Sequence, residues 1–434
     1  MRSPLHAHVP RWARPALLAC ALMVASPAQA QDTAGGPGHT LRSLLMQMLA
    51  ADPQVRLSAI QADIALQRQQ QARSRLGPNL FVESQYGRGN EIEFGQALRR
   101  HTDRADAGLR WNLYNGGIDR AERNATELEA QAGSQEWRRA REEAADRLIG
   151  PYADLLKAQH LLPLAAARLA SVQGLSRQVR EQVVAGKLSE ADGAQADASV
   201  LDAQLSLEQL QLDADSARTR LLALAGVAVD TVLPIDLPPA AALAPANEGT
   251  TGAVAAALHR AEAAAQRVTS ELNLALPRID LEWRKQLSDR TLPQLSTVVQ
   301  HEWRLTARWD FPVMGENAAR RRETQLRADA AQADAQRLAK AVAIDRQALP
   351  ARIAHAERAL AQLDQQIGQQ QTLIRAGQAQ FEAGRRTLAQ LITLHDALFN
   401  VRLRQADMAQ RLLTDRLKAL ALQGQLLGAL GLAT

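Results

Sequence analysis

The sequence has little of three things: cysteine, aromatic residues and long apolar runs. Its 434 residues include one cysteine, Cys20, and only 3% aromatic residues. A compact globular core of this size would use more phenylalanine and tyrosine, whereas the abundant alanine, leucine, glutamine, arginine and glutamate are typical of long helices and coiled coils. Beyond the first thirty residues, no apolar run is long enough for a membrane helix, so any membrane-inserted part must consist of β-strands.

The first thirty residues have the pattern of a secretory signal peptide. A basic start precedes the apolar run PALLACALMVAS, and the small residues AQA end just before Gln31. The run LLAC at Cys20 is a poor lipidation signal, because too little apolar sequence precedes it. Cleavage before Gln31 leaves an exported chain without cysteine, which needs neither a disulfide nor a redox partner.

The charge pattern argues against nucleic acid as a partner. The formal net charge of +5 falls to +2 when the three arginines of the predicted signal peptide are removed (5 − 3). The remaining charges of both signs are interspersed along helices, which is typical of solvated surfaces. The sequence also lacks a phosphate-binding loop and a His-x-x-x-His pair. It therefore predicts no enzyme, no cofactor and no metal site.

The chain repeats itself with an offset of 198 residues. RWNLYNGG begins at Arg110 and RWDFPVMG begins at Arg308 (308 − 110), while QVVAGKLSEA corresponds to QFEAGRRTLA at the same offset. A shared offset for a strand signal and a turn indicates a duplication. Each half has the order helix, two strands, long helix, turn, long helix. We predict these parts: a signal peptide 1–30; a first repeat 31–226 with a hairpin at about 79–115 and a turn near 186; a proline-rich linker 227–250; and a second repeat 251–434 with a hairpin at about 278–312 and a turn near 384.

The long helices have a narrow apolar seam. Between Val200 and Leu224, apolar residues recur in steps of three and four, many of them small. This spacing is typical of coiled coils, and small seam residues let helices pack closely. We therefore expect paired helices after each hairpin.

The predicted strands have one apolar and one charged face. Four of the six tryptophans lie on the apolar face, and they are Trp111, Trp283, Trp303 and Trp309. In the third strand, Ile279 and Leu281 share that face, whereas Arg278, Asp280 and Glu282 share the other. A half-buried sheet in a soluble protein would also alternate. An exported chain with a tryptophan-rich apolar face is more typical of lipid-facing strands with an aromatic belt.

The number of strands predicts an oligomer. Four strands cannot close a barrel, and an open edge in lipid leaves backbone groups unpaired at several kcal/mol each. Two copies would supply eight strands, whose interior is filled by side chains, whereas three would supply twelve and leave a passage. A conducting protein would therefore be a trimer.

These features resemble the TolC family of outer-membrane export ducts. The resemblance rests on the hairpins LRWNLYNGG and LTARWDFPVMG, the two AG-x-x-[ST] turns, and the stretch FEAGRRTLAQLITLHDALFNVRL. It implies a mainly α fold with a membrane β-barrel. A homotrimer would form a 12-stranded barrel in the outer membrane of a Gram-negative bacterium, with four strands per chain. A long α-helical coiled-coil tunnel would continue it into the periplasm.

The resemblance also assigns roles to the two turns. Glycine can end one helix in a left-handed conformation, and a hydroxyl can cap the next. In the family these turns form the periplasmic tip, where the tunnel closes and an adaptor protein docks; the residues here are Gly186, Ser189, Gly384 and Thr387. Asp192 and Arg386 stand where the family holds the closed gate by a polar link.

Three further gate positions depart from the family pattern. Gln390 and Thr393 stand where the family often has acidic residues, which makes a strongly cation-selective constriction doubtful. Phe381 stands where a tyrosine hydroxyl is expected.

Within the family, the C-terminal stretch looks most like the outer-membrane components of type I secretion systems. The resulting prediction is a duct for protein cargo that contacts outer-membrane lipid, a periplasmic adaptor and an inner-membrane ABC or proton-driven transporter. One alternative is the duct of a multidrug or metal efflux pump. A second is a soluble periplasmic coiled-coil scaffold or adaptor whose hairpins form a small sheet.

Overall fold

The computed structural model describes residues 38–93, 96–235, 251–272, 276–289, 301–310 and 315–432. These residues belong to one compact unit, Gly38–Thr434. The predicted signal peptide with Cys20, positions 94 and 95 of the first predicted hairpin, residues 236–250 of the predicted linker, and positions 290–300, 311 and 312 of the second predicted hairpin lie outside the described residues.

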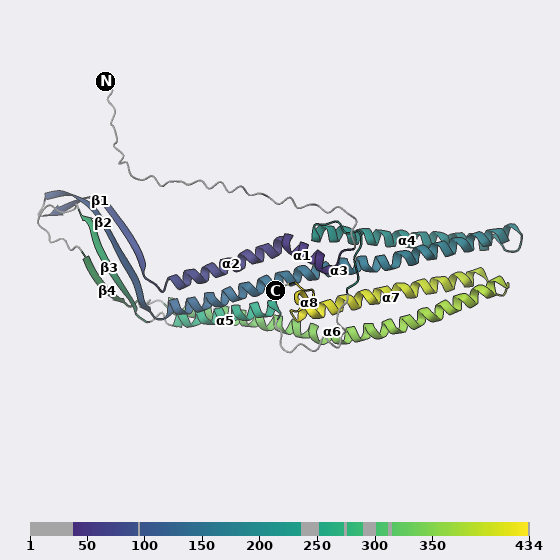
Figure 1. Ribbon diagram of the computed structural model, residues 1–434. Helices are drawn as coiled ribbons and strands as arrows, with labels where there is room; N and C mark the ends of the chain where they lie inside the picture. The colour runs from purple at the N-terminus through teal and green to yellow at the C-terminus, as the bar shows by residue number, and fades with distance from the viewer. Residues whose placement is uncertain are drawn as a thin grey trace, which may run out of the picture. The chain divides into compact units, whose positions relative to one another are not determined.

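The described elements of this unit are long helices and one sheet. In Figure 1, the sheet lies at one end of the helices, and the turns that join α3 to α4 and α6 to α7 lie at the other. The elements are α1 (Leu41–Ala51), α2 (Pro53–Ser74), β1 (Asn79–Glu93), β2 (Gln96–Asn115), α3 (Ile118–Val184), α4 (Glu190–Ala225), α5 (Gly252–Leu272), β3 (Arg278–Asp289), β4 (His301–Arg308), α6 (Glu316–Glu382), α7 (Leu388–Leu422) and α8 (Leu426–Ala429).

The two halves repeat the same elements, which confirms the internal duplication. Helices α3 and α6 both have 67 residues, and each follows a glycine in the left-handed conformation, Gly117 (φ +81°) and Gly315 (φ +76°). These glycines have the predicted offset of 198 (315 − 117). The helices run unbroken through their internal prolines, each of which costs a backbone hydrogen bond.

The sheet is antiparallel, with the strand order β1-β2-β3-β4. The long β1–β2 hairpin pairs Asn79 with Arg110 at one end and Glu93 with Gln96 at the other. The two halves of the chain meet where β2 pairs with β3, and Trp111 is opposite Leu281 there. Within the described sheet, β1 pairs only with β2 and β4 only with β3.

Helix α3 is the centre of the helical part. It packs against α1, α2, α4, α5, α7 and α8, and its middle contributes to the largest buried apolar cluster. Tyr152 is fully buried in that cluster and donates a hydrogen bond to the carbonyl oxygen of Leu233. Burial raises the pKa of Tyr152 to about 12, so it stays a neutral donor. His39 bridges to Val232, which ties the start of the described chain to the segment after α4.

The predicted coiled-coil seam of α4 faces the neighbouring helices. Ala203, Leu210, Ala214, Ala217 and Leu221 of this seam are buried, and α4 packs mainly against α3. None of the described helices is both long and apolar enough to cross a membrane.

Candidate functional site

The two turns at the far end of the helices have the same backbone geometry. Gly186 (φ +70°) follows α3, and Gly384 (φ +68°) follows α6. In each turn the amide after the glycine donates to a carbonyl of the preceding helix: Lys187 to Gln182 at 2.8 Å and Arg385 to Gln380 at 2.8 Å. This bond pattern ends a helix through a left-handed residue, as the sequence predicted for both glycines.

Each turn leads directly into a capping box. Ser189 caps α4 and Thr387 caps α7, and both hydroxyls accept a hydrogen bond from the amide three residues on. This confirms the predicted capping. The side chains of Asp192 and Gln390 complete the boxes by accepting from the amides of Ser189 (3.1 Å) and Thr387 (3.3 Å). The Ser-x-x-Asp and Thr-x-x-Gln spacing is the sequence signal for these boxes.

Asp192 and Gln390 are therefore equivalent residues of the duplicated turn, 198 positions apart (390 − 192). From the sequence alone they were given different roles, one in a polar link and one in a constriction ring. The Ser189 hydroxyl and amide hold the pKa of Asp192 below its usual value. Its carboxylate is turned toward the start of its own helix, and the same is true of the Gln390 amide.

The other predicted gate residues lie around an apolar cluster at the tip. Phe381 packs against this cluster, which contains Leu175, Val179, Ala196, Leu388, Leu391 and Ile392. The Thr393 hydroxyl donates a hydrogen bond to the carbonyl oxygen of Ala389 at 2.8 Å. Arg386 lies across Gly377 of α6, where a Cβ in place of the glycine hydrogen would be 2.6 Å from the Arg386 Nη1 atom. Gly377, which was not predicted as a site residue, thus makes room for this arginine.

The structure does not join Asp192 to Arg386 within one chain. No hydrogen bond or ion pair links them among the described residues. The two residues belong to different hairpins, α3–α4 and α6–α7.

The sheet has the predicted polar face, and its charges are paired across strands. Asp106 of β2 is 3% exposed and lies 2.9 Å from Arg104 and 3.4 Å from Arg284 of β3. Arg110 lies 3.3 Å from Glu282, which also pairs with Arg284 at 2.8 Å. Positive and negative groups thus alternate along this face.

A close contact on the polar face was not predicted. Phe81 is opposite Gly108, and its ring lies between the guanidinium groups of Arg110 and Arg284, 5.0 and 5.6 Å from the ring centroid. A Cβ on Gly108 would lie 2.5 Å from the Phe81 ring and 2.4 Å from the Trp283 carbonyl oxygen. Only glycine therefore lets the ring cover the strand at this point.

The apolar face carries the four predicted tryptophans and is exposed. Leu80, Val82, Trp303 and Leu305 are among its most exposed side chains. Trp283 and Trp303 are paired across β3 and β4, with ring centroids 6.1 Å apart. Trp111 donates to the carbonyl oxygen of Leu76 at 2.9 Å, which fixes it near the start of β1. A large exposed apolar face of this kind marks an interaction surface.

Comparisons with known proteins agree with this geometry. Residues 44–227 match the family of outer membrane efflux proteins. The solved structure of the outer-membrane channel OprN is similar, with 18% identity, a TM-score of 0.77, and coverage of 88% of this chain and 89% of that one. The CmeC outer membrane channel of Campylobacter jejuni has 14% identity, a TM-score of 0.74 and coverage of 89% and 86%. The MtrE channel of Neisseria gonorrhoeae, solved in its open state, has 16% identity, a TM-score of 0.70 and coverage of 90% and 89%. No curated protein sequence is a significant match.

Residues 44–227 thus resemble outer membrane efflux proteins, and the chain has the fold of the solved outer-membrane channels. The predicted fold class, with a four-stranded sheet and long helices, is confirmed.

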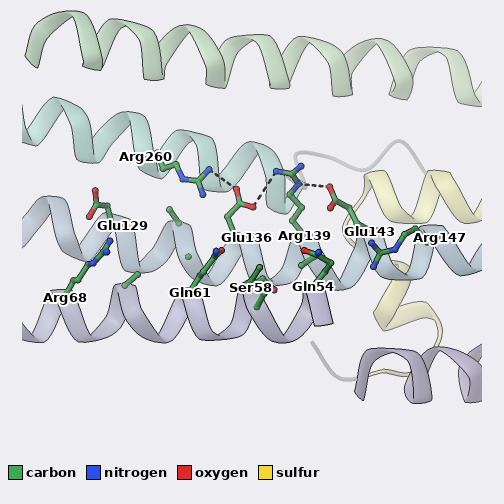
Figure 2. A pocket seen from close by; sticks show the side chains of 15 residues that line it. Gln54, Ser58, Gln61, Arg68, Glu129, Glu136, Arg139, Glu143, Arg147 and Arg260 are labelled. Atoms are coloured by element: carbon green, nitrogen blue, oxygen red, sulfur yellow. Dashed lines mark hydrogen bonds and ion pairs between the residues drawn. The ribbon is translucent and has the colours of Figure 1, made fainter. Parts of the chain in front are cut away.

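A polar groove lies where α2, α3 and α5 meet (Figure 2). It has a volume of ≈ 610 Å³, and several of its charged side chains pair with one another. Glu136 of α3 pairs with Arg260 of α5 at 2.9 Å and with Arg139 at 3.5 Å, and Arg139 also bonds Glu143 at 2.7 Å. Because these charges satisfy one another, the groove ties α5 to α3. It was not predicted from the sequence because its residues come from three distant segments.

Proposed function

We propose that three copies of the chain form one duct across the outer membrane, open to a periplasmic tunnel. The observation that carries this proposal is the sheet with two unpaired edges, β1 and β4, and an exposed apolar face. In lipid, each unpaired backbone group costs several kcal/mol, so the edges need partners. Pairing β4 of one copy with β1 of the next closes twelve strands around a passage, whereas two copies would enclose only side chains.

The helical part supports the same assembly. Leu201, Leu205 and Leu212 lie exposed on α4, and Ile344 and Leu373 lie exposed on α6. Both helices are at the outer sides of the described layer, because α4 packs mainly on α3, and α6 packs on α5 and α7. A neighbouring copy would cover these leucines and isoleucine. On the sheet, Trp111, Trp283, Trp303 and Trp309 would form the aromatic belt that contacts outer-membrane lipid.

The cargo that best fits the comparisons is a small molecule exported by an efflux pump. The family model that matches residues 44–227 is that of outer membrane efflux proteins. A periplasmic adaptor and an inner-membrane ABC or proton-driven transporter would supply selection and energy. A second candidate is type I secretion of protein cargo, which is favoured by the resemblance of the stretch FEAGRRTLAQLITLHDALFNVRL.

The turns Gly186–Ser189 and Gly384–Thr387 would form the adaptor-docking tip of this duct. Their capping boxes hold the exposed helix starts in one shape, which suits a docking surface. Asp192 and Arg386 would meet between neighbouring chains in the closed gate. Gln390 and Thr393 would line a constriction that has little ion selectivity, because neither is charged. Phe381, which packs against the apolar tip cluster, would supply no hydroxyl for a link of the closed gate.

A clean deletion of the gene tests the two cargo classes together. Small-molecule efflux predicts greater sensitivity to several drugs or metals, with an unchanged set of proteins in the medium. Type I secretion predicts the loss of one or a few large proteins from the medium, with unchanged sensitivities. Both effects must return to normal when the gene is restored. An SDS-resistant oligomer that dissociates on boiling tests the duct itself; its absence, together with a soluble location, would favour the scaffold alternative.

A further inference from the structure

Helices α3 and α7 join the two hairpins through a regular series of polar contacts. The Asp154 side chain accepts a hydrogen bond from Gln410, and Lys157 pairs with Asp407 at 3.2 Å. From Asp154 to Lys157 the chain advances three residues along α3, while their partners step back three residues along α7, from Gln410 to Asp407. This is the register expected for antiparallel helices. The same register, continued three turns toward the tip, brings Arg168 to Asp396 at 2.8 Å.

Arg168 is the most buried member of this series. Its side chain is 9% exposed, and its Nη2 atom lies 2.7 Å from Asp202 of α4 and 2.8 Å from Asp396 of α7. Its Nη1 atom donates to the Ser206 hydroxyl at 3.2 Å, and its guanidinium lies over the Phe399 ring, 4.9 Å from the centroid. One guanidinium therefore holds three helices: its own α3, the α4 of its own hairpin and the α7 of the other hairpin.

Between Arg168 and the tip, the two hairpins are joined differently. Arg168 is eighteen residues from Gly186 (186 − 168), or about 27 Å of helix. Over this length, no hydrogen bond or ion pair between the hairpins is present among the described residues, and the contact consists of the apolar tip cluster. The polar pairs there, such as Arg180 with Asp197 at 2.8 Å, stay within one hairpin.

The two kinds of contact respond differently to a movement of the hairpins. Apolar contacts can slide and re-form without leaving a buried charge. Separating Arg168 from Asp396 would instead leave a nearly buried guanidinium short of one partner, which is strongly unfavourable. Arg168 therefore lies at a boundary. On the side away from the tip, polar contacts join the two hairpins; between Arg168 and the turns, only apolar contacts do so among the described residues, and there the hairpins can separate.

We propose that Arg168 is a positioning residue of the closed tip: through Asp396 it holds α7 against α3, and the segments between it and the two turns are the part that moves when the duct opens. This inference rests on the proposed function, in which the tip is the gate. Asp202 has a different role, because it binds the same guanidinium from within the α3–α4 hairpin.

The two aspartates provide a matched test. Asp396→Asn removes the charge that links the hairpins, and Asp202→Asn removes the same charge from the link within one hairpin. Asp407→Asn is a second control, because it weakens an inter-hairpin pair on the far side of Arg168 from the tip. Trimers of the full chain, purified in detergent and checked for heat-resistant assembly, are inserted in planar lipid bilayers, and their single-channel conductance is measured.

We expect the wild type to form low-conductance channels, and Asp396→Asn and Arg168→Gln to raise the mean conductance severalfold, because the tip is then no longer held closed. Asp202→Asn and Asp407→Asn should stay close to the wild type. If Arg168 had only a structural role, Asp396→Asn and Asp202→Asn would both lower the heat resistance of the trimer and would have the same conductance. Equal conductance of Asp396→Asn and Asp202→Asn would overturn the inference, even if Arg168→Gln fails to assemble. Wild-type protein that forms no channels would overturn the proposed function, and the inference with it.

Discussion

Helices α3 and α6 occupy the same place in the two halves of the chain but differ in what covers them. Both have 67 residues and lie between the same kinds of turn. Eighteen residues of α3 are buried, whereas only five residues of α6 are. The difference follows from packing, because α3 lies among six described helices and α6 packs mainly on α5 and α7. A duplicated sequence can thus supply both a central helix and a helix with an open face.

The strongest test of this difference compares two buried side chains at equivalent positions, Leu155 of α3 and Ile353 of α6 (353 − 155 = 198). Leu155 lies in the main apolar cluster, and Ile353 does not. Leu155→Ala should lower the free energy of unfolding by about 2–5 kcal/mol, the usual loss for a fully buried leucine. Ile353→Ala should cost less than half as much. Denaturant unfolding of the solubilised protein measures both, and equal losses would contradict the comparison.

An exposed side chain of α6 tests its open face. Ile344 is 58% exposed in the single chain. Ile344→Lys should leave the helix content unchanged and weaken association by about tenfold, or about 1.4 kcal/mol, because it places a charge in the proposed interface between copies. Analytical ultracentrifugation or native mass spectrometry measures the trimer fraction. Ile344→Val, which keeps the surface apolar, is the matched control, and a trimer unaffected by the lysine would show that this face is not the interface.

A carboxyl group on α3 that α6 lacks makes the stability of the chain depend on pH. Glu142 is half-buried and lies against Gly424 at the end of α7, whereas the equivalent residue of α6 is the exposed Lys340 (340 − 142 = 198). Burial raises the pKa of Glu142 to about 7, although Arg138 and Arg141 oppose the shift. The folded chain therefore disfavours the ionised form. The penalty is absent below the ordinary pKa of 4.5, grows as the pH rises, and is complete above about 7.

Glu142→Gln removes this penalty. The variant should match the wild type at pH 4 and be more stable at pH 8 by about 1 kcal/mol, less than the full shift implies because solvent screens a half-exposed carboxylate. Thermal unfolding at the two pH values measures the difference. Lys340→Gln is the control and should show no such pH dependence. A stability gain at pH 4 would mean that the carboxyl group is not the cause.

The smallest effect is expected at the tip, where the two halves are alike. Ser189→Ala and Thr387→Ala should each cost about 1 kcal/mol, because each leaves one amide of the first helical turn without its acceptor. Hydrogen exchange of the first turns of α4 and α7 should rise by a similar factor in the two variants. A clear difference between them would show that the duplicated turns are not equivalent.

Local features of the fold could be predicted from the sequence. The alternation in Ile279, Leu281 and Trp283 determined the face of β3, and the glycine–hydroxyl spacing determined both turns. These features depend on residues that are close in sequence, for which strand periodicity and capping rules are sufficient. The TolC-family fold could be predicted for the same reason, because its elements recur in a fixed order.

The functional residues could be predicted less well. Asp192 was assigned to a polar link, but within one chain its carboxylate completes a capping box. Phe81 was not identified because its role depends on Gly108 of the next strand. Arg168 was not identified because its partners, Asp202 and Asp396, are far away in the sequence. Charges on a long helix are mostly solvated, so no local pattern distinguishes the one that is buried.

The sequence by itself thus determined the duplication, the strand faces, the helix starts and the turns. Each of these depends only on residues two to four positions apart or on one constant offset between the halves. Only the tertiary structure decided which of two equally long helices is central, which face of α6 stays open, and which arginine joins the two hairpins. Those outcomes depend on the register and packing of helices that are distant in the chain, and a repeated pattern is compatible with more than one such packing.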